Sequence, residues 1–138
     1  MPLLGPGRAD AGAAIEGTVV RVVDGDTIHV QLADRVEKVR HIGVDSLEMH
    51  HPVNGEEPGG RAAASVNRGL VEGRRVRRDR WGRLLAYVWV GDTMINAELI
   101  RLGYAHVMTV PPNVRYQELF VKLQREAREA GRGLWRPI

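Results

Sequence analysis

The sequence contains no cysteine, which excludes both a disulfide scaffold and a zinc site built from thiolates. A chain of 138 residues needs neither, because a single domain of this length can bury an adequate hydrophobic core. No apolar run approaches the length of a transmembrane helix, and the first residues, from Met1 to Gly5, do not have the pattern of a signal peptide. We therefore expect one domain with no membrane partner.

Lysine is also scarce, since 18 of the 20 basic residues are arginine. Arginine matches the geometry of phosphate oxygens better than lysine does, although coding bias or thermal adaptation produces the same skew. The charge is uneven along the chain: residues 1–73 carry 11 acidic and 7 basic side chains, whereas residues 74–138 carry 6 acidic and 13 basic ones. This asymmetry favours a site where acids collect a metal and bases collect phosphates, with solvated surface charge as the alternative.

Hydrophobic periodicity predicts strands in the first half and helices later in the chain. The predicted strands are 15–23, 27–32, 36–44 and 84–90, and the predicted helices are 61–71, 94–102 with Thr93 as its cap, and a last helix that carries Leu119, Phe120, Leu123 and Ala127. This order indicates an α+β fold with a small antiparallel barrel. We expect residues 1–14 to be a disordered lead-in and residues 15–138 to form a single domain.

Two short segments, Asp24–Thr27 and Arg40–Glu48, together hold four acids and one arginine. Carboxylate and carbonyl oxygens suit calcium, so the predicted metal ligands are Asp26, Asp45 and the carbonyl of Ser46, although ligand type alone leaves magnesium and manganese open. Glu48 lies three residues beyond Asp45 and is predicted to hold a water as a general base. An ordinary turn is the alternative for Asp24 and its neighbours, because turns favour Asp and Gly.

Two arginines are candidates for binding a phosphate. Arg40 falls on the same face of its predicted strand as Ile42 and Val44, where a charged side chain needs a partner or a ligand. Arg83 ends a polar segment just before the next predicted strand. Two arginine forks beside a metal would grip one phosphate and stabilise the charge of a five-coordinate phosphorus. A hairpin turn with exposed arginines is the alternative for Arg83 alone.

Taken together, these motifs resemble those of the staphylococcal nuclease family, over roughly residues 15–136. Each motif alone is weak, but the joint pattern is highly specific. The matching segments are Asp24-Gly25-Asp26-Thr27, Arg40-x-x-Gly43-Val44-Asp45-x-x-Glu48, Asp79-x-x-Gly82-Arg83-x-Leu85-Ala86-Tyr87, Met94-Ile95-Asn96 with Leu99, Gly103-Tyr104-Ala105 and Gly133-Leu134-Trp135.

The resemblance implies a five-stranded OB-type barrel with three helices. It also implies calcium-dependent hydrolysis of phosphodiester bonds in DNA and RNA, with single-stranded substrates preferred and little dependence on base sequence. In this family pattern Asp26, Asp45 and the Ser46 carbonyl bind Ca²⁺. Glu48 orients or deprotonates the attacking water, and the catalytic arginines, Arg40 and Arg83, hold the scissile phosphate. Relatives are commonly secreted, but the sequence itself leaves localisation open.

The sequence departs from the family pattern near its predicted site. Leu47 replaces a proline before Glu48, which is expected to loosen the position of that glutamate. The loop 108–112 lacks the tyrosines that stack on a base in the family, so Trp81 or Tyr87 compensates only if it lies nearby.

The link between Gly73 and Asp79 is several residues shorter than in the family. We expect an abbreviated fourth strand, residues absent from the printed sequence, or a strand exchanged between two copies of an otherwise monomeric protein. The arginines of this stretch predict either a nucleic-acid track or a solvated edge strand. They are Arg74, Arg75, Arg77, Arg78 and Arg80.

Two functions therefore compete. The first is an active calcium-dependent nuclease, and the second is a nucleic-acid-binding module of the same fold with weakened chemistry. The enzyme is favoured because the set Asp26, Arg40, Asp45, Glu48 and Arg83 is complete. A barrel that binds only proteins is a third option, but it leaves the acidic segments without an explanation.

Overall fold

The computed structural model describes residues 14–46, 59–81, 85–109 and 114–136, without the side chains of residues 14 and 79–81. The strands are β1 Ala14–Asp24, β2 Thr27–Gln31, β3 Val36–His41, β4 Val44–Asp45, β5 Arg75–Trp81, β6 Leu85–Val90, β7 Thr93–Met94 and β8 His106–Val107. The helices are α1 Gly60–Val71, α2 Ile95–Arg101, α3 Gln117–Ala130 and a short 3₁₀ helix at Gly133–Trp135. The predicted lead-in at 1–14 lies almost wholly outside the described residues and stays a prediction.

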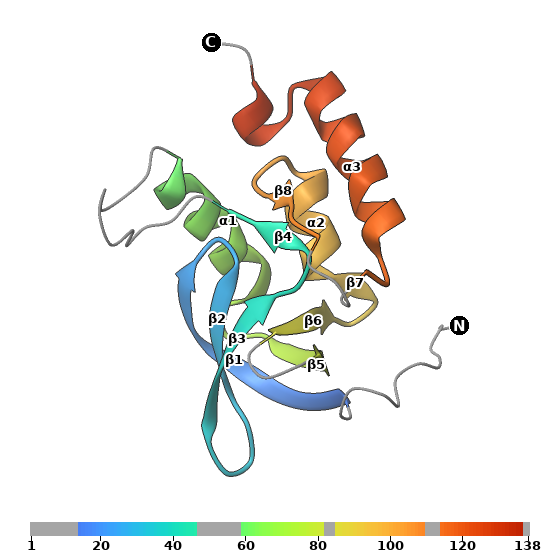
Figure 1. Cartoon of the computed structure of the whole chain (residues 1–138). Coiled ribbons are helices and arrows are strands. Elements are labelled where there is room, and N and C mark those ends of the chain that lie inside the picture. The colour runs from blue at the N-terminus through green and yellow to red at the C-terminus, as the bar shows by residue number, and fades with distance from the viewer. Residues whose placement is uncertain (1–13, 47–58, 82–84, 110–113, 137–138) are drawn as a thin grey trace, which may run out of the picture.

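Five strands form a closed barrel in the order β3-β2-β1-β5-β6, and β7 extends the sheet beyond β6 (Figure 1). All neighbours are antiparallel except the pair that closes the barrel, in which β3 runs parallel to β6. Figure 1 shows α2 and α3 together on one side of the barrel, while the β2–β3 hairpin extends away from them. The predicted α+β fold with an OB-type barrel and three α-helices is confirmed.

The fourth barrel strand is complete rather than abbreviated. β5 is a seven-residue strand that begins two residues after Gly73 and pairs with β1 on one side and β6 on the other. Gly73 has a φ of +73°, a left-handed conformation that lets the chain leave α1 and enter β5 at once. The prediction of an edge strand is therefore wrong, because β5 lies inside the sheet. A barrel closed within one chain also removes the reason for expecting strand exchange.

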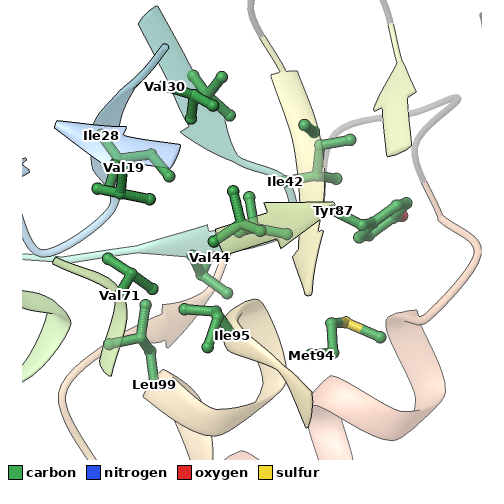
Figure 2. Close-up of a cluster of buried hydrophobic side chains, with 14 of the residues drawn as sticks. Val19, Ile28, Val30, Ile42, Val44, Val71, Tyr87, Met94, Ile95 and Leu99 are labelled. Carbon is green, nitrogen blue, oxygen red and sulfur yellow. The ribbon is translucent and has the colours of Figure 1, made fainter. Parts of the chain in front are cut away.

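The core is built mainly from β-branched side chains of the barrel and from one face of each neighbouring helix. Figure 2 shows Val19, Ile28 and Val30 of the barrel, with Val71 at the end of α1 and the α2 residues beside it. Ile28 and Val30 are fully buried, as their alternating pattern predicts. This apolar interior makes a disulfide or a structural metal unnecessary for the fold.

The helices lie close to their predicted positions, with one correction to a predicted cap and one to a residue of the predicted apolar pattern. Thr93 does not cap α2: it lies in β7, and the helix begins at Ile95 without a side-chain cap. Leu119 of α3 is exposed, whereas Phe120 on the same helix is buried. Within the described residues, no helix is long and apolar enough to cross a membrane.

Asn96, at the start of α2, joins the helix to the point where the barrel closes. Its side chain is fully buried and accepts a hydrogen bond from the backbone N–H of Val88 at 2.9 Å. It donates to the carbonyls of Ile42, at 2.9 Å, and Ala86, at 3.2 Å. The amide thus pairs with three backbone groups at the closure, of which the Ala86 carbonyl also accepts the Ile42 N–H at 2.9 Å.

An ion pair lies inside the barrel between β5 and β3. The Arg78 side chain is 2% exposed, and its Nε donates to Glu37 Oε1 at 2.6 Å while Nη2 donates to Oε2 at 3.2 Å. Arg78 is therefore not part of a solvent-facing basic track. Removing one member would leave the other charged group buried, at a cost of several kcal/mol.

We expect Glu37→Ala to lower the free energy of unfolding by about 3–5 kcal/mol, because Arg78 would keep its charge inside the barrel. Urea denaturation at neutral pH measures this change. The matched control is Glu98→Ala, which removes the partner of exposed Arg101 and is expected to cost less than about 1 kcal/mol. Equal losses in the two variants would contradict the structural role of the buried pair.

Candidate active site

The turn between β1 and β2 orients Asp26 through its own side chains. Asp24 Oδ1 accepts the backbone N–H of Asp26 at 3.2 Å, and Thr27 Oγ1 donates to Asp26 Oδ1 at 2.9 Å. Gly25 is required here by space, since a Cβ at this position would lie 2.5 Å from Ser46 Oγ and 2.8 Å from the Ala63 Cβ of α1. The Asp-Gly-Asp sequence is therefore a tightly packed turn, in which the second aspartate is 4% exposed.

One nitrogen of Arg40 joins the two predicted metal-binding aspartates. Arg40 Nη2 donates to Asp26 Oδ2 at 3.1 Å, to Asp45 Oδ1 at 3.3 Å and to the Val44 carbonyl at 3.0 Å. Both carboxylates thus lie within hydrogen-bonding distance of the same atom. The Asp45 side chain is 53% exposed and that of Asp26 only 6%, so the pair spans the boundary between the protein interior and solvent.

Ser46 enters the site through its backbone. Its N–H donates to Asp26 Oδ2 at 2.9 Å, and the residue is 6% exposed. This bond fixes the chain that follows β4 against the β1–β2 turn. The predicted coordination by the Ser46 carbonyl stays a prediction.

The three charged groups change one another's acid–base behaviour. Burial favours the neutral form of Asp26, but the hydrogen bond and charge of Arg40, with the Ser46 N–H, bring the pKa of Asp26 below its ordinary value. Burial and the charge of Asp26 raise the pKa of Asp24 to about 6. Burial opposes the charge on Arg40, yet Asp26 raises the pKa of Arg40 above its ordinary value. Asp26 and Arg40 are therefore a charged pair at neutral pH.

The segment that carries Asp45 is held between the barrel and α3. Gly43 has a φ of +82°, and a Cβ on it would lie 2.5 Å from the ring of Phe120. The next two residues form β4, which pairs antiparallel with β8 in the register Asp45↔His106. The glycine of the Arg40–Glu48 motif thus lets the chain turn against α3 and present Asp45.

A buried polar pair behind the site was missed by sequence reasoning. His41 is fully buried, and its Nε2 lies 3.3 Å from Oδ1 of Asn67 in α1. Asn67 Nδ2 in turn donates to the Asp24 carbonyl at 2.9 Å. The His41 backbone N–H donates to the Asp26 carbonyl at 2.8 Å. This network joins α1 and β3 to the turn that carries Asp26. Asn67 has the same helical spacing as the buried apolar residues of α1. This spacing was the only indication in the sequence that its side chain is buried.

His41 is neutral in this setting. Since Asn67 donates through its nitrogen, its oxygen accepts the proton on His41 Nε2. His41 Nδ1 is buried without a hydrogen-bond partner among the described residues, so a proton there would have no acceptor. Burial accordingly lowers the pKa of His41 to about 4.

Two of the predicted catalytic residues, Glu48 and Arg83, lie outside the described residues, as does Leu47. The strand that follows Arg83 begins at Leu85, which pairs with Arg40. Tyr87 is 1% exposed and packs edge-on against the Tyr116 ring at 4.8 Å. It therefore cannot stack on a base.

The described residues contain no group of three or more His, Asp or Glu side chains placed to hold a metal ion. Asp26 and Asp45 nevertheless offer hard oxygen donors that converge on one point. This donor set fits a hard cation such as calcium and not a soft one. The residues present are thus compatible with the predicted ion, although they account for only part of a calcium shell.

The barrel and the arginine-bridged aspartates define a class of OB-type proteins with a charged site beside the β1–β2 turn. A family model described as staphylococcal nuclease homologue matches residues 38–137. The chain belongs to the staphylococcal nuclease family, as its motifs indicated.

Individual relatives extend the match over most of the chain. It is 39% identical over 124 residues to the thermonuclease of Staphylococcus intermedius, covering 85% of this chain and 74% of that protein. It is 36% identical over 124 residues to the thermonuclease of Staphylococcus hyicus, covering 85% and 73%. It is 34% identical over 127 residues to Endonuclease YncB of Bacillus subtilis, covering 86% and 60%.

The neutral state of His41 predicts a specific loss of stability in acid. Unfolded His41 has an ordinary pKa of 6.5 and the folded residue one of about 4, so the unfolded state binds more protons between these values. The contribution is present above pH 6.5 and is lost as the pH falls through 4, in total about 3 kcal/mol.

Urea denaturation between pH 7 and pH 4 tests this prediction. His41→Leu is expected to flatten the pH dependence of the unfolding free energy relative to the unmodified chain. His106→Gln, at an exposed histidine, is the control and should leave the dependence unchanged. An identical pH profile in the unmodified chain and His41→Leu would contradict the buried neutral state.

Proposed function

We propose that this protein is a calcium-dependent nuclease that hydrolyses phosphodiester bonds in DNA and RNA with little sequence preference. The observation that carries the proposal is the meeting of Asp26 and Asp45 at one guanidinium nitrogen of Arg40. Two similar proteins are named thermonucleases and a third is named an endonuclease, which supports the same reaction class.

The proposed calcium site consists of Asp26, Asp45 and the Ser46 carbonyl. When bound there, Ca²⁺ would supply positive charge to a non-bridging phosphate oxygen. The charged state of Asp26 at neutral pH suits this role, because a ligand carboxylate must be deprotonated. Burial, and after it the negative charge of Asp26, raises the pKa of Asp24, and a cation between the carboxylates would offset the second of these effects.

Arg40 has donors to spare for a phosphate. Its contacts with Asp26, Asp45 and the Val44 carbonyl all use Nη2, and its Nε and Nη1 groups have no partner within the described part of the chain. The side chain is 28% exposed, so these remaining N–H groups can reach solvent. Asp26 and Asp45 thereby orient Arg40, and its free N–H groups bind the scissile phosphate with Arg83.

Glu48 is the proposed general base. It would take a proton from the attacking water as the new oxygen–phosphorus bond forms, and the bond to the leaving oxygen then breaks. Arg40 and Arg83 would stabilise the extra charge on the five-coordinate phosphorus between these events. Leu47, in place of proline, is expected to make Glu48 less well positioned and the enzyme slower, without abolishing the reaction.

The absence of family tyrosines from the 108–112 loop, together with the burial of Tyr87, favours weak base selection. Base stacking contributes on the order of 1–3 kcal/mol per base where it occurs. We propose that single-stranded nucleic acid is the better substrate, because its phosphates are accessible without unwinding. A monomer and secretion are further expectations from the family resemblance.

The same fold with weakened chemistry, acting as a nucleic-acid-binding module, is the second candidate. Leu47 is the observation that favours it, because Glu48 must be held accurately to act as a base. The two candidates differ in turnover and not in binding.

The decisive measurement is the degradation of denatured DNA in calcium or in chelator. We expect cleavage in calcium, none in chelator, and a loss of about 10²–10⁴-fold in rate for Glu48→Gln, the range typical of a lost general base. Arg83→Ala is expected to reduce the rate comparably. Arg68→Ala and Glu72→Gln, at an exposed pair on α1, are the controls and should retain full activity. Binding of DNA in calcium with no cleavage by the unmodified chain would favour the module.

A further inference from the structure

Three basic side chains form a row across the outside of the barrel. The strand register places Arg21 of β1 opposite His29 of β2, and His29 opposite Lys38 of β3. Cross-strand partners on one sheet face have neighbouring side chains. Arg21 and Lys38 are exposed and His29 is half-buried, so this basic row faces solvent.

The basic row is not neutralised by nearby carboxylates. Neither Arg21 nor Lys38 has an ion-pair or hydrogen-bond partner in the described part of the chain. Some other exposed arginines do have such partners, although Arg125 of α3 is exposed and likewise has none among the described residues. Arg35 lies 2.9 Å from Asp34, Arg75 lies 3.7 Å from Glu16 and Arg101 lies 2.6 Å from Glu98.

Crowding within the row is visible in the behaviour of its central residue. Partial burial, followed by the charges of Arg21 and Lys38, lowers the pKa of His29 below its ordinary value. The two flanking charges are therefore close enough to repel a proton on the imidazole. An arrangement of like charges without counter-ions is unfavourable by itself and gains when an anion binds across it.

The basic row leads directly to the candidate active site. Lys38 and Arg40 are two residues apart on β3, so they project from the same face, and Arg40 pairs with Thr27 just as Lys38 pairs with His29. Along the strand, Lys38 and its partner His29 therefore lie about 7 Å from Arg40 and its partner Thr27, because a strand rises about 3.3 Å per residue. A polynucleotide with one phosphate at Arg40 can therefore place a neighbouring phosphate over Lys38 and His29.

We propose that the basic row of Arg21, His29 and Lys38 is a phosphate-binding subsite that holds the backbone of a single-stranded polynucleotide next to Arg40. This inference rests on the proposed nuclease function and identifies how that site would distinguish a polymer from a single nucleotide. The row recognises backbone charge and carries no base specificity. Its contribution is to binding of the polymer and not to the chemical step.

The test compares Arg21→Gln/Lys38→Gln with Lys122→Gln/Arg125→Gln, a control that removes one lysine and one arginine from the exposed surface of α3. Binding of a fluorescent 12-nucleotide oligothymidine is measured by anisotropy in a Glu48→Gln background, as a function of salt. The row variant is expected to weaken binding on the order of tenfold, the combined effect of two exposed charge contacts. The salt slope should fall by about 1.4, for two lost single-strand phosphate contacts.

Kinetics with Glu48 intact provide the second readout. In the row variant kcat/KM for the 12-mer should fall about tenfold, as binding does. Hydrolysis of the p-nitrophenyl ester of a single thymidine nucleotide should be unchanged, because that substrate does not reach the row. The control should leave both unchanged.

Equal binding losses in the row and control variants would overturn the subsite, since the effect would then be general charge attraction. An unchanged salt slope in the row variant would overturn it as well. A failure of the unmodified chain to cleave either substrate would instead contradict the proposed nuclease function, and the anisotropy comparison would still decide whether the row binds phosphate.

Discussion

Parallel pairing of β3 with β6 closes the barrel at Arg40↔Leu85 and His41↔Ala86, and the buried amide of Asn96 secures that junction from α2. Several parts of the candidate site lie at this closure. Arg40 lies in the closing pair, and the strand after Arg83 begins at its partner. The same junction orients His41, whose backbone supports the Asp26 turn. The five barrel strands are each paired on both sides within one chain.

The site brings one arginine together with two aspartates, so its positive charge balances its negative charge only in part. Arg40 bridges Asp26 and Asp45 through one nitrogen and keeps its other donors available. One guanidinium faces two carboxylates, and burial together with the charge of Asp26 raises the pKa of nearby Asp24. The proposed function uses both kinds of charge, with a cation between the carboxylates and an anion beside the arginine. Those are the two components of metal-assisted phosphodiester hydrolysis.

Much of the site was predictable because its residues lie at strand ends and in a tight turn, which local motifs describe well. The convergence of Asp26, Arg40 and Asp45 followed from those motifs. The burial of Arg78 did not, because its sequence neighbours are arginines and its partner, Glu37, is 41 residues away. The central place of β5 was missed for a similar reason: a run of arginines is typical of an exposed edge. Cross-strand contacts decide such cases, and periodicity cannot identify them.

The sequence by itself determined the α+β class, the turn at Asp24–Thr27 and the acids and arginines available to the site, because propensity, periodicity and motif spacing are local properties. Only the tertiary structure decided which arginine is buried, how His41 and Asn67 support the turn, and how Arg21, His29 and Lys38 form one row. These features depend on register between strands and on packing between distant segments. A one-residue shift of register would move each side chain to the other face of the sheet.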